Sequence, residues 1–148
     1  MSKPQIRPAR DSDFEALVPL MKGFATTQEK GLHERFLQIL ENPNMVFFVA
    51  MLEEKILGYA LAQGYGARLR SGEESVRLHD LMVATDSRKS GVGTALFFEV
   101  QNWTKARSAR YLEWQSSSQG LGFYERLGFK GEPCPQPEYP FFELDFVA

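Results

Sequence analysis

The stretch DSRKSGVGTALFF, residues 86–98, decides the fold. Two glycines, Gly91 and Gly93, lie in a basic, hydroxyl-bearing segment, and strongly apolar residues follow at once. The segment before it, residues 76–85, is rich in β-forming and apolar residues. After it, the apolar residues have helical spacing: Leu96, Phe97, Val100 and Trp103. The stretch is therefore predicted to be a loop that leaves a buried strand and enters a helix.

A loop of this kind has two interpretations. The first N–H groups of a helix lack backbone partners and carry the positive end of the helix dipole, so they bind anions. Glycines allow a phosphate to approach the backbone closely, while Arg88 and Lys89 add positive charge and Thr94 adds a hydroxyl. The alternative is an ordinary turn. The loop lacks the Walker pattern and the third glycine of a dinucleotide fingerprint, so its own residues leave both interpretations open.

Hydrophobic periodicity over the rest of the chain predicts a mixed α/β (α+β) sheet with helices on both faces. Strands are expected near residues 4–8, 45–52, 56–65, 76–85 and 109–117, with a C-terminal hairpin of residues 129–132 and 139–146. Helices are expected over residues 12–24, 31–42, 94–107 and 119–128. Ser12 and Glu15 have capping-box spacing, and Pro19 predicts a kink or break in the first helix.

Composition excludes several classes of protein. The chain has 148 residues, 43% of them hydrophobic, which suits one domain over residues 1–148. A net charge of −2 argues against broad nucleic-acid binding. No apolar run is long enough for a membrane span, and no signal peptide is visible, so a cytoplasmic location is expected. The single cysteine, Cys134, and the two histidines, His33 and His79, do not have metal-ligand spacing, so no metal is expected.

Three motifs together resemble one family. RKSGVG, residues 88–93, matches the [QR]-x-x-G-x-[GA] signature of the GCN5-related N-acetyltransferase (GNAT) family, and LHDLMVATDS, residues 78–87, resembles the strand that leads into it. GFYERLGF, residues 122–129, is similar to the family's FYxKLGF segment. IRPARDSDFEAL, residues 6–17, resembles its first strand and helix. The chain is thus predicted to be a GNAT-like domain with a twisted, mostly antiparallel sheet and a splayed central pair of strands.

The resemblance implies transfer of an acetyl group from acetyl-CoA to a primary amine, by direct attack in a ternary complex. The loop would hold the pyrophosphate through Arg88, Lys89, Ser90, Gly91, Val92, Gly93 and Thr94. The edge of the preceding strand, at Leu81, Met82 and Val83, would bond the pantetheine arm. A small-molecule amine is the favoured acceptor. The alternatives are a peptide or protein amine, or a CoA-binding module with little catalysis.

The same resemblance suggests the catalytic groups. Tyr124 lies where the family's tyrosine protonates the sulfur of CoA, so it is expected to be the general acid. His79 is the preferred base because a pKa near 6.5 suits the task, with Asp80 or a water chain as alternatives. Strand alternation puts His79 and Asp80 on opposite faces unless a bulge intervenes. Ser117 stands where relatives often have asparagine, and it is expected to contact the pantetheine more weakly.

The acceptor and the oligomeric state are left open. Acceptor choice is expected to depend on the first two helices and on residues 66–75, where no motif identifies the amine. His33 and the acidic residues Glu29, Glu34 and Glu41 border this region, but a solvated helix face is the favoured interpretation. Many relatives are dimers, which allows a homodimer here.

Overall fold

The computed structural model describes residues 3–24, 26–88, 90–117, 120–131, 140 and 142–147, without the side chain of Phe24. Two compact units divide the chain, Met1–Trp114 and Gln115–Ala148, and each is described by itself. None of the helices in the described ranges is long and apolar enough to span a bilayer.

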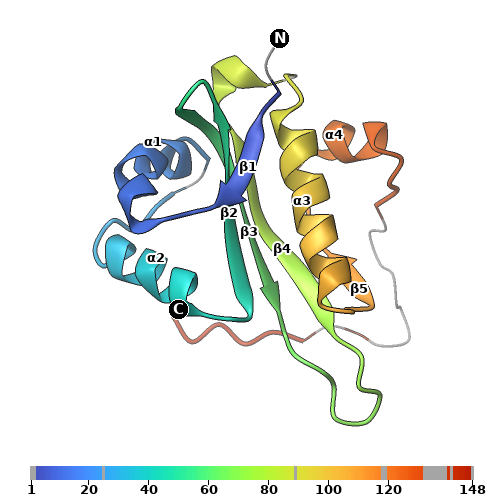
Figure 1. Cartoon of the computed structure of the whole chain (residues 1–148). Helices are drawn as coiled ribbons and strands as arrows, with labels where there is room; N and C mark the ends of the chain where they lie inside the picture. Colours follow the sequence, from blue (N-terminus) through green and yellow to red (C-terminus); the bar gives the residue numbers. More distant parts are fainter. Residues whose placement is uncertain are drawn as a thin grey trace. The chain divides into compact units, whose positions relative to one another are not determined.

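The first unit is built on one five-stranded sheet in the order β1-β2-β3-β4-β5 (Figure 1). Its strands are β1 (Gln5–Pro8), β2 (Met45–Leu52), β3 (Lys55–Gly64), β4 (Ser75–Val83) and β5 (Tyr111–Glu113). Pairing is antiparallel from β1 to β4, and β5 lies parallel to β4. This confirms the predicted mixed, mostly antiparallel sheet.

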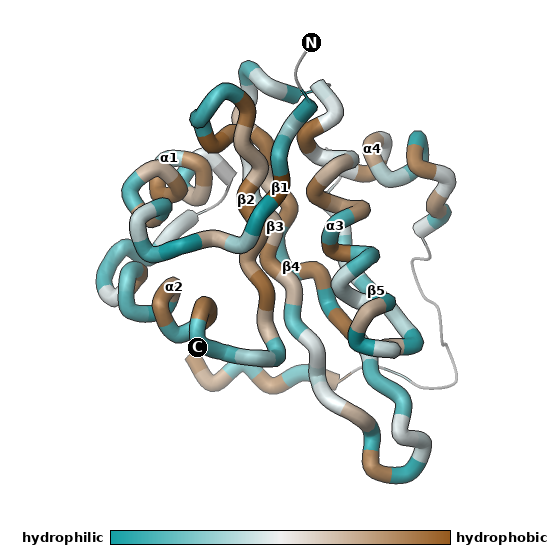
Figure 2. Tube along the Cα trace, in the orientation of Figure 1, coloured by the Kyte–Doolittle hydropathy of each residue, from teal (hydrophilic) through white to brown (hydrophobic). Residues whose placement is uncertain are grey.

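Helices cover both faces of this sheet. The elements outside it are η1 (Asp11–Asp13), α1 (Phe14–Phe24), α2 (Leu32–Glu41), η2 (Thr85–Ser87) and α3 (Val92–Ala106). Figure 1 shows α1 and α2 on one face and α3 on the other. Hydrophobic residues are prominent along β2 and β3 in Figure 2, as burial on both faces requires.

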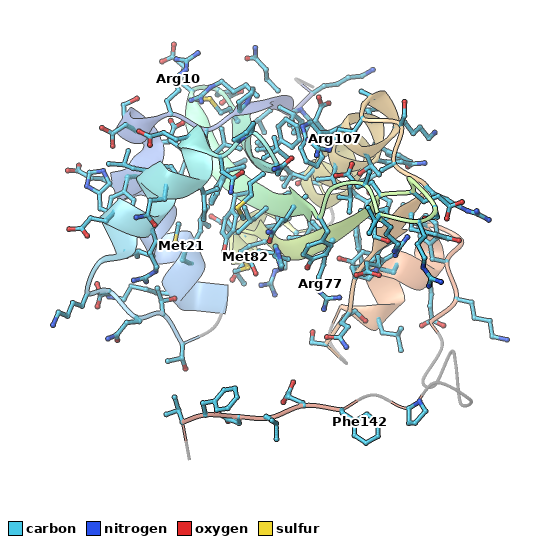
Figure 3. The ribbon with its side chains drawn as sticks, turned by 90° about the horizontal axis from the view of Figure 1, so that it is seen from below. Arg10, Met21, Arg77, Met82, Arg107 and Phe142 are labelled. Carbon is cyan, nitrogen blue, oxygen red and sulfur yellow. The ribbon has the colours of Figure 1, made fainter. Side chains whose placement is uncertain are left out.

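Each face has its own apolar packing. Under α1 and α2 the buried cluster consists of Leu17, Phe36, Phe47, Val49, Tyr59 and Met82. Met21 of α1 packs against this cluster, and Figure 3 shows its side chain on the same side as Met82. Under α3 the buried side chains of the helix are Val92, Leu96, Phe97, Val100 and Thr104. Burial of these groups is the main stabilising contribution to the unit.

The start of α1 differs from its prediction in two ways. Asp13, rather than Glu15, caps this end: its carboxylate accepts the backbone N–H of Arg10 at 2.7 Å and two guanidinium bonds from Arg7 at 2.8 and 2.9 Å. The capping box of Ser12 and Glu15 is therefore wrong. Pro19 removes the N–H that would bond to the Glu15 carbonyl, yet α1 continues through it to Phe24, so the predicted break is also wrong.

The second unit contains α4 (Leu121–Arg126). The expected C-terminal hairpin is wrong for its described residues, 129–131, 140 and 142–147, which form no strand. The alternating apolar side chains Phe142, Leu144 and Phe146 are exposed, and an isolated hairpin with an exposed apolar face is marginal in water. The rest of that hairpin, including Cys134, lies outside the described residues.

Candidate active site

A β-bulge interrupts β4 at the predicted base. Leu61 of β3 pairs with Asp80, whereas the next residue, Ala62, pairs with Leu78, so that His79 is one extra residue in β4. The two adjacent residues of such a bulge project from the same face of the sheet. His79 contacts Gln63, and Asp80 pairs with Leu61, so both side chains lie on the face covered by α1 and α2. In a regular strand only one of His79 and Asp80 would project from this face. Because of the bulge, both do.

The His79 imidazole and the Asp80 carboxyl shift each other's pKa, in addition to the effect of burial. Burial and the nearby Arg77 guanidinium lower the pKa of His79 below 6.5, while Asp80 partly opposes this. Burial raises the pKa of the Asp80 carboxyl above its usual range, and His79 partly opposes that shift. Asp80 in turn contributes, after burial, to the raised pKa of the Tyr59 phenol. A neutral imidazole and a half-buried carboxyl therefore lie side by side, as proton-transfer chemistry requires.

Past this bulge, one edge of β4 has no strand beside it in the first unit. β5 pairs with β4 from Ser75 to Arg77 and ends at Glu113, so Leu78 to Val83 have no partner on this edge among the described strands of the first unit. Whether the two strands splay, as the resemblance implies, stays a prediction. The backbone groups of Leu81, Met82 and Val83 lie in this part of β4, where an extended ligand can pair with a strand edge.

The glycine loop follows this edge directly. Gly91 is the N-cap of α3, with a φ of 91°, and no side chain caps the helix. A Cβ on Gly91 would meet nothing within 4 Å, so the space in front of the helix is open. Ser90 donates its hydroxyl to the Ser87 carbonyl and Arg88 donates to the Val83 carbonyl, which tie the loop to the end of β4. Uncapped N–H groups facing open space suit a pyrophosphate.

A second glycine, which the sequence analysis did not single out, sets the position of this loop. A Cβ on Gly58 of β3 would lie 2.7 Å from the Met82 carbonyl oxygen and 3.1 Å from side-chain carbons of both Val92 and Leu96. Only glycine allows the first turns of α3 to pack this closely on the sheet. Gly58 thereby allows the first turns of α3 to lie close to β3 and β4.

The remaining predicted site residues belong to the second unit, except Lys89, which lies outside the described residues. Tyr124 is on α4, where burial raises its pKa to about 12, so the phenol keeps its proton at neutral pH. Ser117 accepts the backbone N–H of Gly120 at 3.2 Å, which gives its hydroxyl a structural role at the start of α4. Their roles at the cofactor stay predictions.

The residues near the expected acceptor side are largely structural. His33 contacts Asp11 at 2.6 Å and stacks on Phe14 with ring centroids 4.4 Å apart, which fastens α2 to the start of α1. Phe47 and Phe48 are core residues. The described residues hold no group of three or more histidine, cysteine, aspartate or glutamate side chains placed to bind a metal ion.

Comparison with solved structures gives the same architecture. A transcriptional regulator from Bacillus halodurans C-125 has 22% sequence identity and a TM-score of 0.78, with 97% of this chain and 100% of that chain covered. Glucosamine-6-phosphate N-acetyltransferase from Arabidopsis thaliana has 18% identity and a TM-score of 0.79, with 98% and 99% covered. AAC(6')-Iy, solved with the bisubstrate analogue CoA-S-monomethyl-acetylneamine, has 21% identity and a TM-score of 0.80, with 97% and 99% covered. At these identities the likeness establishes the fold.

The family follows from the sequence itself. No curated protein sequence matches the chain significantly. The sequence profile of the Acetyltransferase (GNAT) family, in contrast, matches residues 11–129, which are most of the chain. The chain therefore belongs to the GNAT acetyltransferase family of acetyl-CoA-dependent N-acetyltransferases.

Proposed function

We propose that the protein transfers the acetyl group of acetyl-CoA to a primary amine on a small molecule, by direct attack in a ternary complex. One observation carries the proposal: the free edge of β4 runs directly into the uncapped N-terminus of α3, with His79 and Asp80 on the same strand. The glucosamine-6-phosphate and AAC(6') neighbours support a small-molecule amine as the acceptor.

The cofactor would be held by backbone groups. The N–H groups at the start of α3, from Val92 to Thr94, would bind the pyrophosphate, and the open space at Gly91 would admit it. Arg88 at the mouth of the loop, Lys89 next to it in sequence and the backbone N–H of Ser90 would add donors, because the Ser90 hydroxyl already donates to the Ser87 carbonyl. The edge from Leu81 to Val83 would pair with the amides of the pantetheine arm. Acetyl-CoA supplies the activated thioester, and the chain supplies orientation and proton transfer.

The reaction needs a base on the amine side. A primary ammonium ion must lose a proton before its nitrogen can attack the thioester carbon. His79 suits this role because its lowered pKa keeps the imidazole neutral at neutral pH, with a lone pair available. Asp80 on the same face is the alternative base. A water chain without a dedicated base is the third possibility.

The reaction also needs help for the leaving group. When the new C–N bond has formed and the C–S bond breaks, the electron pair of that bond goes to the sulfur of CoA. Tyr124 keeps its phenol proton at neutral pH, since burial raises its pKa to about 12. It would donate that proton to the departing thiolate, and the second proton that the nitrogen loses as the amide forms would restore the phenol. The proton that His79 takes from the ammonium ion passes later to solvent.

A panel of amines tests the proposal. Thiol release from acetyl-CoA is followed with amino sugars, aminoglycosides, polyamines, a peptide with a free N-terminus and a peptide with an internal lysine. Faster release with at least one small amine than with either peptide supports the proposed acceptor class. Release with the peptides alone would overturn it in favour of a protein or peptide acetyltransferase. Tight CoA binding with no amine-dependent release would indicate a binding module.

A further inference from the structure

Gln63 of β3 fixes the orientation of the His79 ring. Its side-chain oxygen lies 2.9 Å from His79 Nε2. An amide oxygen accepts hydrogen bonds but cannot donate them, so this contact is a hydrogen bond when Nε2 carries the proton of the neutral imidazole. The other nitrogen, Nδ1, then has the free lone pair. A base that uses this lone pair must attack from the Nδ1 side of the ring.

The bulge explains why such a contact is needed. A regular strand residue packs beside the residue paired with it, but His79 is the extra residue and has no pairing partner in β3. Its side chain is only partly buried, so packing alone does not fix the ring. Gln63 pairs with Arg77, two residues before His79, and reaches the ring from the neighbouring strand. A hydrogen bond from Nε2 to this oxygen would set both the ring orientation and the tautomer.

We propose that Gln63 is a positioning residue for acetyl transfer, which holds His79 through Nε2 so that Nδ1 is the proton acceptor. This inference rests on the proposed function in one respect, the assignment of His79 as the base. Gln63 touches neither substrate in the proposal and acts only through the imidazole, as the third member of a catalytic triad does.

The charges around His79 make the proposal testable by pH. Arg77 and Asp80 on β4 are the charged groups that perturb its pKa, and Glu113 of β5 forms an ion pair with Arg77 at 3.7 Å. Tyr59 of β3 lies near Asp80. No charged side chain of α1 or α2 in the described residues is among the groups that shift it. Gln63 itself adds no charge beside the imidazole. The variant Gln63→Glu would keep an oxygen that accepts the hydrogen bond from His79 and would add a negative charge.

The first test determines the tautomer of His79 by ¹⁵N NMR of the imidazole rings. The chain has only two histidines, so a His33→Asn variant assigns the signals. The parent protein is expected to show His79 with the proton on Nε2, and Gln63→Leu is expected to show a mixture of tautomers. Gln38→Leu, on the exposed surface of α2, is the matched control and should leave the spectrum of His79 unchanged. A pure Nε2–H tautomer in Gln63→Leu would overturn the proposal.

The second test measures the kinetics of acetyl transfer in variants of Gln63. Gln63→Leu should lower kcat about tenfold with KM for acetyl-CoA unchanged, because the base is misoriented while the cofactor site is intact. Gln63→Glu should retain the orientation and shift the acidic limb of kcat/KM upward by about one pH unit, because a nearby anion stabilises the imidazolium. An unshifted limb, or a full kcat in Gln63→Leu, would refute the positioning role. A parent protein that acetylates no amine would refute the proposed function instead, and the NMR result would still decide the role of Gln63.

Discussion

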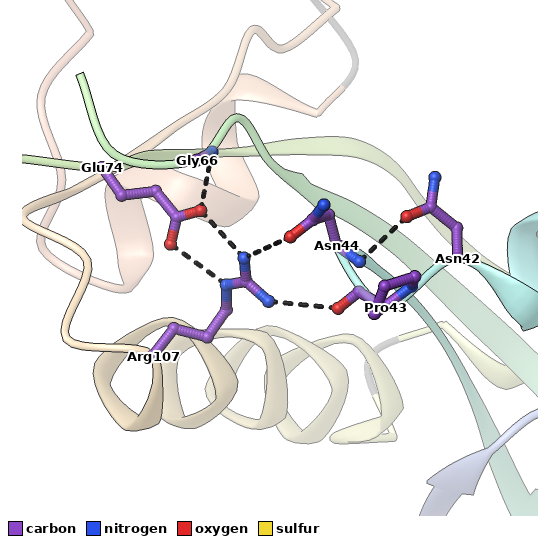
Figure 4. Close-up of polar contacts among 6 residues, drawn as sticks. All are labelled: Asn42, Pro43, Asn44, Gly66, Glu74 and Arg107. Carbon is purple, nitrogen blue, oxygen red and sulfur yellow. Dashed lines mark hydrogen bonds and ion pairs between the residues drawn. The ribbon is translucent and has the colours of Figure 1, made fainter. Parts of the chain in front are cut away.

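The carboxylate of Glu74 accepts two hydrogen bonds from the guanidinium of Arg107, at 3.1 Å from Nε and 2.8 Å from Nη2 (Figure 4). The same carboxylate accepts the backbone N–H of Gly66 at 2.8 Å. Arg107 also donates to the Pro43 carbonyl and to the Asn44 side chain. One ion pair therefore joins the C-terminal end of α3 to the segment before β4 and to the start of β2. We call this ion pair of Arg107 and Glu74 the clasp. It anchors the C-terminal end of α3 on the sheet, and the loop proposed to bind the cofactor lies at the other end of this helix.

Removing one partner of the clasp should destabilise the fold. The side chains of Arg107 and Glu74 are 22% and 9% exposed, so Glu74→Gln leaves a largely desolvated guanidinium without its counter-charge. We expect the free energy of unfolding to fall by about 2 kcal/mol, less than for a fully buried pair. Urea unfolding at pH 7 measures it. Glu73→Gln is the matched control, because its ion pair with Arg110 is exposed, and it should unfold like the parent. Equal stability of the two variants would contradict the anchoring role.

The clasp should also have a predictable pH dependence. Hydrogen bonds from Arg107 lower the pKa of Glu74 below its ordinary value of 4.5 in the folded state. A lowered folded pKa contributes stability that is present above the unfolded pKa and is lost as the pH falls through the folded pKa. The difference in unfolding free energy between the parent and Glu74→Gln should thus be largest at neutral pH and shrink in acid. A difference that grows below pH 4.5 would be inconsistent with this ion pair.

Gly91→Glu should abolish CoA binding while the protein remains folded. The new side chain would place a negative charge in the open space before α3, where the pyrophosphate is proposed to bind. Calorimetric titration with CoA measures the loss. Gly72→Glu is the control, because Gly72 also has a positive φ, 74°, and nothing within 4 Å of its Cβ position. It introduces the same charge and comparable backbone strain away from the loop. Unchanged affinity in Gly91→Glu, or equal loss in both variants, would remove the loop from the phosphate site.

Tyr124→Phe should lower kcat by about 10- to 100-fold and leave the affinity for CoA nearly unchanged. The variant keeps the aromatic ring beside Phe123 but loses the proton that the thiolate is proposed to receive. Steady-state kinetics and a CoA titration separate the two effects. Tyr111→Phe, on the exposed strand β5, provides a control for the loss of one phenol. Equal turnover in Tyr124→Phe and the parent would exclude the proposed acid.

The pH profile should identify the base. If His79 takes the proton, kcat/KM falls only below the pKa of His79, and this limb lies under 6.5 because burial and Arg77 lower that pKa. His79→Gln should then lose most of the activity and the limb with it, whereas Asp80→Asn should keep the limb. The reverse pattern would assign the base to Asp80. An unchanged profile in both variants would favour a water chain.

Local sequence was sufficient to predict the glycine loop before α3 and most of the sheet. The glycine that caps α3 and the apolar spacing after it are properties of adjacent residues, and the structure places the helix from Val92 to Ala106. Strand positions also followed from alternation and turn residues. The same alternation predicted the C-terminal hairpin, and this prediction is wrong for the described residues. Alternation indicates that one face of a segment is apolar, but not which element covers that face.

The features that arrange the site depend on residues distant in sequence. The bulge at His79 is a matter of register between β3 and β4, which the pattern of β4 alone does not set. The contact from Gln63 and the close approach at Gly58 depend on the same pairing. Arg107 and Glu74 are 33 residues apart in the sequence. An arginine and a glutamate at that separation do not by themselves predict an ion pair. The sequence motifs therefore predicted the loop and strands of the candidate site in the first unit, but not which side chains contact one another there.

A crystal structure of the protein with CoA bound tests the central claim most directly. The account predicts the pyrophosphate at the N–H groups of Val92 to Thr94, and the pantetheine arm along β4 from Leu81 to Val83. Pyrophosphate bound anywhere other than the N-terminus of α3, or a pantetheine arm that makes no backbone hydrogen bond to β4, would contradict it.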